Sequence, residues 1–193
     1  MAECGYSIFD TMIGRCGIAW GDYGVLGVQL PEAREIETRG RMLRQYPGAR
    51  ELRPPLNAEI AIEGISAALR GDAADLADIT LDTAGIHAFN QRVYQLTRAI
   101  PRGETRTYGD IAAKLGASGA VHSVAQAISR NPFMIIVPCH RVLEAGSYAD
   151  KISPNGGVIS KRRLLSIEGA RGTISSKTLF DVLLPVAPPR PQG

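Results

Sequence analysis

The chain has 193 residues, a formal net charge of +3 and a hydrophobic fraction of 45%. This composition is that of an ordinary globular protein, which excludes collagen-like, low-complexity and disordered classes. No apolar run approaches the ~20 residues of a membrane-spanning helix. Glu3 and Asp10 stand where a secretion signal would place lysines before an apolar core. We therefore expect a cytoplasmic protein that has no contact with a membrane.

The charge is distributed unevenly along the chain. Residues 1–97 carry 9 basic and 13 acidic side chains, whereas residues 98–171 carry 11 basic and 5 acidic ones. The second half is therefore the half suited to a polyanion such as nucleic acid. A positive excess of this size also occurs on ordinary solvated surfaces, so charge alone does not decide the partner.

The first half predicts a small antiparallel sheet followed by two helices. The expected strands are 6–9, 17–20 and 25–30, with a Gly-Asp-Tyr-Gly hairpin turn between the last two. An Arg- and Glu-rich segment predicts a helix over 32–45. Ile60, Ile65 and Leu69 recur at near-helical spacing and predict a second helix over about 57–69. We expect this half to support the other, because it shows no catalytic set.

After a boundary near 82–85 the sequence predicts a largely helical and basic half. An amphipathic helix is expected over 87–100, with His87 as a surface residue at its start. Helices over 107–115 and 120–129 follow, joined by a glycine-containing turn, which is the helix-turn-helix pattern. The small side chains of the second helix suit close approach to another surface. They suit tight packing in a core equally well.

The three cysteines, Cys4, Cys16 and Cys139, are an odd number without paired spacing. This pattern indicates neither a disulfide framework nor a four-ligand zinc cluster. Cys4, Cys16 and His87 together could supply a metal site, but the usual short spacings between ligands are absent. We expect no metal and no other cofactor.

The segment Pro138-Cys139-His140-Arg141-Val142 places a thiol beside an imidazole and a guanidinium. Neighbouring positive charge, or a base that takes the proton, converts a thiol into the nucleophilic thiolate. A cysteine at the end of an apolar run such as 133–137 is also a common core residue. Pro138 favours the functional interpretation, because proline ends strand pairing and places Cys139 where a strand stops and a loop or cleft begins.

Several motifs in order resemble the O6-alkylguanine-DNA alkyltransferases, also called methylated-DNA–protein-cysteine methyltransferases. Besides the cysteine motif and Asn131-Pro132, they are Ile100-Pro101-Arg102-Gly103-Glu104-Thr105, Thr107-Tyr108-Gly109, and Gly156-Gly157 followed by Lys161, Leu164-Leu165 and Glu168-Gly169. The resemblance covers about residues 86–170. It implies a suicide repair protein that binds duplex DNA as a monomer, flips an alkylated guanine into a pocket and accepts the alkyl group once.

The resemblance also implies a role for each matching residue. Cys139 would be the alkyl acceptor, His140 its base through a water, Glu168 the group that orients His140, and Tyr108 a hydrogen-bond donor to the flipped base. The residues implied in DNA contact are Ala120, His122, Ser123, Arg106, Lys114 and Arg130, with Arg102 as a further phosphate contact. Those implied in lining or supporting the pocket are Asn131, Arg141, Val142, Asn155, Gly156, Gly157 and Lys161. On DNA the protein would be associated with the nucleoid.

Two departures from the family pattern bear on base delivery. His122 stands where the recognition helix usually carries an arginine that fills the space of the flipped base, and histidine is shorter and mostly neutral near pH 7. The loop 144–155 is about two residues longer than the common pattern and has Pro154-Asn155 in place of a frequent Tyr-Ser pair. Tyr148 could compensate from elsewhere in that loop. The small recognition helix suits a shallow minor-groove approach rather than base readout in the major groove.

The sequence therefore predicts an α+β protein of three parts. A sheet-and-helix support domain spans 1–83, a mainly helical DNA-binding alkyltransferase domain spans 84–172, and an extended or disordered proline-rich tail spans 173–193. One alternative function is a sensor that binds alkylated DNA and recruits other factors without transfer, although relatives of that type lack the cysteine. A cysteine hydrolase is disfavoured, because adjacent residues rarely align as nucleophile and direct base and no oxyanion motif is visible.

Overall fold

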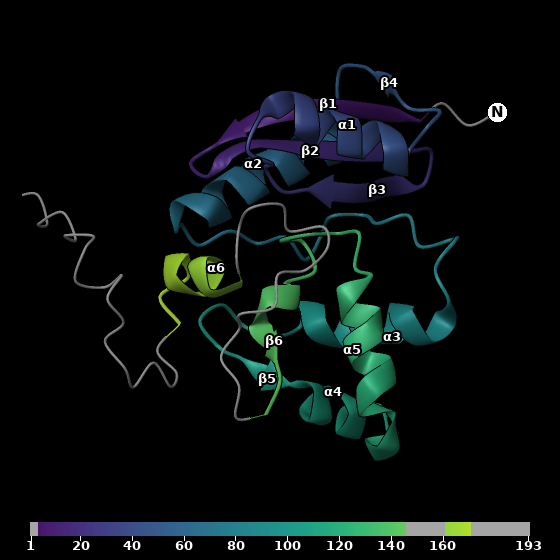
Figure 1. Ribbon diagram of the computed structural model, residues 1–193, viewed down its shortest axis with the longest axis vertical. Helices are drawn as coiled ribbons and strands as arrows, with labels where there is room; N and C mark the ends of the chain where they lie inside the picture. Colours follow the sequence, from purple (N-terminus) through teal and green to yellow (C-terminus); the bar gives the residue numbers. More distant parts are fainter. Residues whose placement is uncertain (1–3, 146–160, 171–193) are drawn as a thin grey trace, which may run out of the picture.

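The computed structural model describes residues 4–145 and 161–170 of the chain. They form the predicted α+β fold, in which a small sheet with two helices lies above a mainly helical half (Figure 1). No helix within these two ranges is long and apolar enough to cross a membrane.

The N-terminal sheet has four strands in the order β3-β2-β1-β4. They are β1 (Gly5–Thr11), β2 (Gly14–Gly21), β3 (Gly24–Gln29) and the short β4 (Arg50–Glu51). The first three form an antiparallel meander, and β4 runs parallel to β1. The hairpin turn ends at Gly24, whose φ of +133° favours glycine. A side chain there would also lie 2.5 Å from the carbonyl oxygen of Thr80.

Two helices cover opposite faces of this sheet. Helix α1 (Glu35–Gln45) buries Met42 against Tyr6 and Ala19. Helix α2 (Leu56–Arg70) buries Ala58, Ala61, Ile65 and Leu69 in the larger core, which also holds Ile18 and Trp20. Alternate residues of a strand point to opposite faces, which is why neighbouring residues of β2 lie in different clusters.

Ile60 does not share the buried face of α2 with Ile65 and Leu69, because this residue is 47% exposed. Alanines at 58 and 61 take the inward positions instead and allow α2 to lie close to the sheet.

The second half contains α3 (Ala88–Arg98), α4 (Tyr108–Lys114), α5 (Val121–Ser129) and α6 (Lys161–Ile167). The first three confirm the predicted helices. The His87 side chain accepts a hydrogen bond from the Phe89 amide at the start of α3. Thr107 begins α4 with a reciprocal capping box to Asp110. A 3₁₀ turn, Ser118–Ala120, leads into α5, and β5 (Arg106–Thr107) pairs in parallel with β6 (Val142–Leu143).

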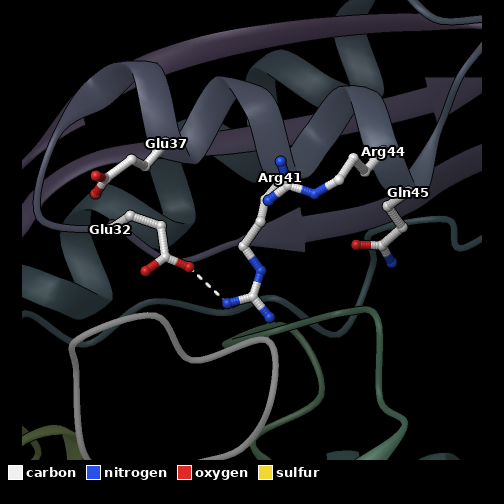
Figure 2. A pocket seen from close by; sticks show the side chains of 5 residues that line it. All are labelled: Glu32, Glu37, Arg41, Arg44 and Gln45. Carbon is white, nitrogen blue, oxygen red and sulfur yellow. Dashed lines mark hydrogen bonds and ion pairs between the residues drawn. The ribbon is translucent and has the colours of Figure 1, made fainter.

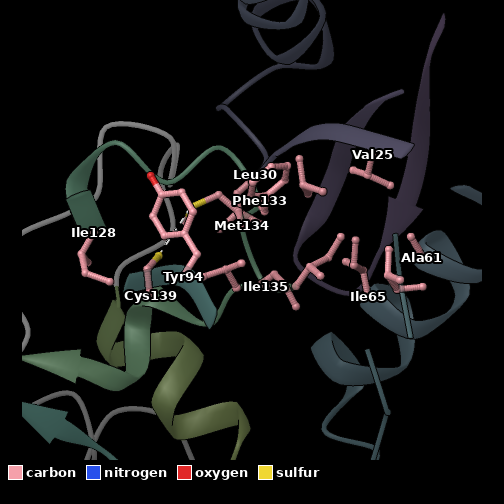
Figure 3. Packing of buried hydrophobic residues seen from close by; sticks show 14 of the residues in the cluster. Val25, Leu30, Ala61, Ile65, Tyr94, Ile128, Phe133, Met134, Ile135 and Cys139 are labelled. Atoms are coloured by element: carbon pink, nitrogen blue, oxygen red, sulfur yellow. Dashed lines mark hydrogen bonds between the residues drawn. The ribbon is translucent and has the colours of Figure 1, made fainter. Parts of the chain in front are cut away.

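One hydrophobic core runs through both halves of the molecule. Val28 of β3 bridges Phe133, and its amide donates to the Pro132 carbonyl at 2.8 Å. Figure 3 follows this core from Val25 and Ala61 beside the sheet to Cys139 beside α5. The apolar contact positions the cysteine segment against the sheet. The division into domains at residue 83 stays a prediction, and the tail 173–193 lies outside the described residues.

The segment 133–137 is not the expected strand. It folds into a tight turn in which the Val137 amide donates to the Phe133 carbonyl at 2.8 Å and the Ile136 amide to the Met134 carbonyl at 2.9 Å. Ile135 has a φ of +71°, which is unfavourable for a β-branched residue. Apolar content alone did not separate a buried turn from a buried strand, because both exclude water equally.

Candidate active site and DNA-facing surface

Cys139 begins a short 3₁₀ turn, Cys139–Arg141, directly after the buried turn 133–137. Its amide donates to the Val137 carbonyl at 2.7 Å. The expected position of Cys139 at a loop is therefore correct. Its side chain is fully buried, however, so the thiol does not lie open in a cleft. Burial raises the pKa of the Cys139 thiol, while the charge of Lys161 acts in the opposite direction. The thiol therefore needs a base to become a thiolate near neutral pH.

His140 and Glu168 form a buried pair. The imidazole Nε2 lies 2.8 Å from Glu168 Oε1, and the two side chains are 2% and 9% exposed. Burial lowers the pKa of His140 despite the opposing effect of Glu168. Burial also raises the pKa of Glu168, but hydrogen bonds from His140 and Arg141 outweigh it and bring this pKa to about 2. The resting pair is thus a neutral imidazole that donates from Nε2 to a carboxylate.

This arrangement leaves Nδ1 of His140 as a proton acceptor. Within the described residues, Nδ1 is buried and has no hydrogen-bond partner. A neutral imidazole that donates from one nitrogen carries a lone pair on the other. The geometry therefore presents a general base held in a fixed tautomer by a carboxylate.

Arg141 joins the same carboxylate to the connection after α3. Its Nε donates to Glu168 Oε2 at 2.9 Å, and its Nη2 donates to Oε1 at 2.7 Å. Nη1 donates to the Ile100 carbonyl at 2.5 Å. A bidentate guanidinium fixes the orientation of a carboxylate more firmly than a single hydrogen bond does. Glu168, from the end of α6, is thereby held toward His140.

Asn131 joins the end of α5 to the cysteine turn. Its Nδ2 donates to the Val137 carbonyl at 2.9 Å, and its Oδ1 accepts from the Phe133 amide at 3.0 Å. The side chain is fully buried. Because buried backbone groups without partners are costly, these two bonds stabilise the unfavourable turn around Ile135.

Tyr108 and Lys161 meet beside the cysteine motif. Lys161 Nζ donates to the Val142 carbonyl at 3.1 Å and lies 3.3 Å from the Tyr108 hydroxyl. The same ammonium lies 5.6 Å from the centroid of the Tyr108 ring. Lys161 is buried and Tyr108 is partly exposed. The lysine thus connects α6, β6 and the start of α4.

Two neighbours of the thiol were missed by the sequence analysis. The Cys139 thiol donates to the Met134 thioether at 3.7 Å. Burial, and then the nearby Cys139, raise the pKa of Tyr94 to about 12. The Tyr94 hydroxyl donates to the Ala127 carbonyl at 3.0 Å. Neither Met134 nor Tyr94 belongs to a motif that the sequence analysis used, and only the folded turn brings Met134 close to Cys139.

The outer face of α5 exposes Val121, His122 and Ser123, while Val124, Ala127 and Ile128 are buried. Ala120 just before it is partly exposed. The His122 Nε2 lies 3.1 Å from Gln126 Nε2. One face of this helix packs in the core, as one interpretation expects, and close approach of the exposed face to another surface stays a prediction.

The basic residues expected at phosphates differ in their surroundings. Lys114 and Arg130 are exposed. Arg106 forms an ion pair with Glu104 at 2.7 Å. Arg102 donates from one guanidinium nitrogen to the Gly71 and Ile167 carbonyls and so joins α2 to α6, and its contact with phosphate stays a prediction.

A charged hollow elsewhere on the molecule contains none of the predicted site residues. It lies along α1 and is lined by Glu32, Glu37, Arg41, Arg44 and Gln45 (Figure 2). Arg41 donates to Glu32 at 2.5 Å across it. In residues 4–145 and 161–170, no three His, Cys, Asp or Glu side chains gather as metal ligands.

Comparison with known proteins agrees with this geometry. Residues 88–170 match the family described as "6-O-methylguanine DNA methyltransferase, DNA binding domain". A methylated-DNA–protein-cysteine methyltransferase of Methanothermobacter thermautotrophicus is 35% identical over 153 residues, which are 79% of this chain and 78% of the relative. One from Mycobacterium leprae is 45% identical over 121 residues, 63% of this chain and 70% of the relative.

The chain belongs to the methylated-DNA–protein-cysteine methyltransferase family.

It is an enzyme of this kind, and solved structures of the family share its fold. The crystal structure of the Mycobacterium tuberculosis O6-methylguanine methyltransferase superposes with a TM-score of 0.67 at 31% identity and covers 89% of this chain and 96% of its own. The same organism's protein in complex with DNA superposes with a TM-score of 0.64 at 31% identity, covering 86% and 94%. The α+β fold expected for this methyltransferase is confirmed.

The structure brings together Cys139, His140, Arg141, Glu168 and Asn131, as the family resemblance implies. Their roles in transfer stay predictions. Asn155, Gly156, Gly157 and Tyr148 lie outside the described residues, as do Pro154 and the larger part of the loop 144–155.

Proposed function

We propose that this methyltransferase repairs duplex DNA by one irreversible transfer of the alkyl group of O6-alkylguanine to Cys139. The observation that carries the proposal is the buried set of Cys139, His140 and Glu168, in which His140 is neutral and presents Nδ1 as a base. Every side chain of this set comes from one chain, which supports action as a monomer.

The transfer is a displacement at carbon. A water molecule accepts the Cys139 proton and passes a proton to Nδ1 of His140, while Glu168 stabilises the resulting imidazolium through Nε2. The thiolate sulfur forms a bond to the alkyl carbon, and the bond from this carbon to guanine O6 breaks. The electron pair stays on the guanine, which leaves as an anion and takes up a proton. In the product thioether the sulfur carries no proton and is a poor leaving group. The free cysteine is therefore not regenerated, and each molecule transfers one alkyl group.

Tyr108 is the donor that helps the guanine to leave. A hydrogen bond from its hydroxyl to the flipped base stabilises the negative charge that develops on the purine. Lys161 lies 3.3 Å from this hydroxyl and 3.1 Å from the Val142 carbonyl. It orients the phenol while also favouring the thiolate of Cys139 by its charge.

Base flipping is the step that brings a buried thiol to a base in a duplex. The target nucleotide leaves the helical stack, and Ala120, His122 and Ser123 of the recognition helix enter the minor groove. Their small or short side chains let the backbone come close to the groove. Lys114 and Arg130, which are exposed, and Arg106 contact phosphates.

The test is to incubate the protein with duplex DNA that contains O6-methylguanine and to measure its intact mass. We expect a gain of one methyl group per protein, never more, and no gain in Cys139→Ser. Wild-type protein that binds the damaged duplex without any gain in mass would contradict the proposal and favour the sensor. A gain that persists in Cys139→Ser would place the acceptor elsewhere.

A further inference from the structure

The nucleophile of this enzyme has a second sulfur atom as its neighbour. Cys139 Sγ donates to Met134 Sδ at 3.7 Å, and the two side chains are 0% and 2% exposed. Figure 3 shows the two sulfur atoms facing one another beside Tyr94. Both sulfur atoms are shielded from bulk solvent, and the thiol hydrogen lies between them.

The backbone directs Met134 to this place. The turn 133–137 closes through the hydrogen bond from Val137 to Phe133, and Ile135 adopts its φ of +71° at the centre. Asn131 holds both ends of the turn. A strand over 133–137 would carry residues 134 and 139 away from one another along the chain axis. The unfavourable turn therefore has a consequence for the nucleophile.

We propose that Met134 is a positioning residue for the transfer: its thioether accepts a hydrogen bond from the Cys139 thiol in the resting protein and so keeps this sulfur protonated until the substrate is bound. The proposal rests on the proposed role of Cys139 as acceptor. A thioether is a weak acceptor that can bind a thiol but has no proton to offer a thiolate. It therefore stabilises one protonation state of Cys139 and not the other.

Other groups around the thiol act in the opposite direction. Lys161 from α6 favours the thiolate, as does a hydrogen bond from Asn131 at the end of α5. His140, the next residue, supplies the base, and Tyr94 from α3 is a further titratable neighbour within the described residues. By stabilising the thiol, Met134 opposes the effect of these groups on the protonation of Cys139 in the resting state. This contact protects an acceptor that can be used only once from alkylation or oxidation before it meets damaged DNA.

The first measurement uses no DNA. The thiolate of Cys139 is titrated by its ultraviolet absorbance, with the Cys139→Ser protein of each background subtracted. In Met134→Leu we expect the midpoint to fall by about half to one pH unit, which raises the thiolate fraction below the midpoint about three- to tenfold. Met42→Leu is the matched control, since Met42 is equally buried but lies beside the sheet, and its midpoint should equal that of the wild type.

Norleucine keeps the test decisive if Met134→Leu does not fold. It replaces each sulfur by a methylene, and incorporation in place of the four methionines should lower the Cys139 midpoint in the wild-type background. In a folded Met134→Leu background the same labelling should cause no further change. An unchanged or raised midpoint in both Met134→Leu and the labelled wild type overturns the proposal.

The second measurement is the single-turnover rate of methyl transfer from duplex DNA against pH. We expect the rising limb of the Met134→Leu profile to move to lower pH by the same amount as the thiolate midpoint, and that of Met42→Leu to stay in place. A profile that does not move while the thiolate midpoint does would overturn the role of Met134 in transfer. Absence of transfer in wild type, with the midpoints still shifted, would contradict the proposed function alone.

Discussion

The two faces of the catalytic half differ in how tightly their residues are fixed. Around Cys139, the side chains of His140 and Asn131 are buried and those of Arg141 and Glu168 are largely so, and hydrogen bonds join them to partners from the ends of α5 and α6 and the connection after α3. On the exposed face of α5, His122 bonds within the described residues only to Gln126 of the same helix. Proton transfer needs atoms at fixed positions, whereas contact with a DNA backbone tolerates movement.

This difference predicts which substitutions should have large effects on transfer and on stability. A change inside the buried set leaves a polar group without its partner in a place that water cannot reach, which is costly. A change on the exposed face of α5 alters one contact among several. The expected effects therefore fall from the interior of the site to its surface.

The largest effect is expected for His140→Gln. Glutamine can still bond to Glu168 but offers no base for the Cys139 proton, so the single-turnover rate of methyl transfer should fall by about 10²- to 10⁴-fold. The measurement is intact mass against time with O6-methylguanine duplex. Affinity for the duplex, measured by fluorescence anisotropy, should stay within about twofold of wild type as the control. A rate within tenfold of wild type would contradict the relay.

Acidification should slow transfer through the same residue. Because burial lowers the pKa of His140 below its ordinary value of about 6.5, protonation of this base should add a fall in rate of about tenfold per pH unit below the shifted value, beyond the fall that protonation of the Cys139 thiolate causes. Folding stability should fall between about pH 6.5 and this lower value, since in that interval the unfolded chain binds a proton at His140 and the folded chain does not. Glu168 adds a further loss of stability as pH approaches about 2.

The check is a transfer-rate profile together with urea unfolding at each pH. His140→Gln should remove the His140 part of both pH dependences. A wild-type profile with the same slope as that of His140→Gln at every pH at which both proteins stay folded would argue against a neutral imidazole as the base.

Asn131→Ala should destabilise the fold by about 2–5 kcal/mol, because two buried backbone groups, the Val137 carbonyl and the Phe133 amide, lose their partner. Urea unfolding gives the free energy of unfolding. Arg34→Ala is the surface control: its ion pair with Glu37 joins two exposed side chains, and its unfolding midpoint should match that of wild type. A loss below about 1 kcal/mol in Asn131→Ala would show that the turn does not depend on this side chain.

The smallest effect is expected for His122→Arg. A longer, permanently charged side chain on the exposed face of α5 should raise the affinity for duplex DNA about two- to fivefold and steepen its salt dependence by about one unit of log–log slope. His87→Arg, at the exposed start of α3, adds the same charge away from α5 and should change neither quantity. Equal gains in both variants would mean that net charge, not position, governs binding.

Most helices and strands followed from local chemistry. The glycine-containing hairpin turn located β2 and β3, and the helix-turn-helix pattern located α4 and α5. Short elements such as β4 and β6 were missed, because two residues carry too little pattern. The turn 133–137 was misread as a strand because its apolar content reflects burial and not backbone shape.

The sequence by itself determined the chemistry available: a thiol, an imidazole and a carboxylate in motifs of one family, on an α+β fold. Only the tertiary structure decided how these groups act, because the separation of 28 residues between His140 and Glu168 is closed by packing and not by any local pattern. The tertiary structure also decided the protonation of His140, which depends on burial. It decided the sulfur contact between Met134 and Cys139 as well, because this contact depends on a turn that no sequence motif predicts.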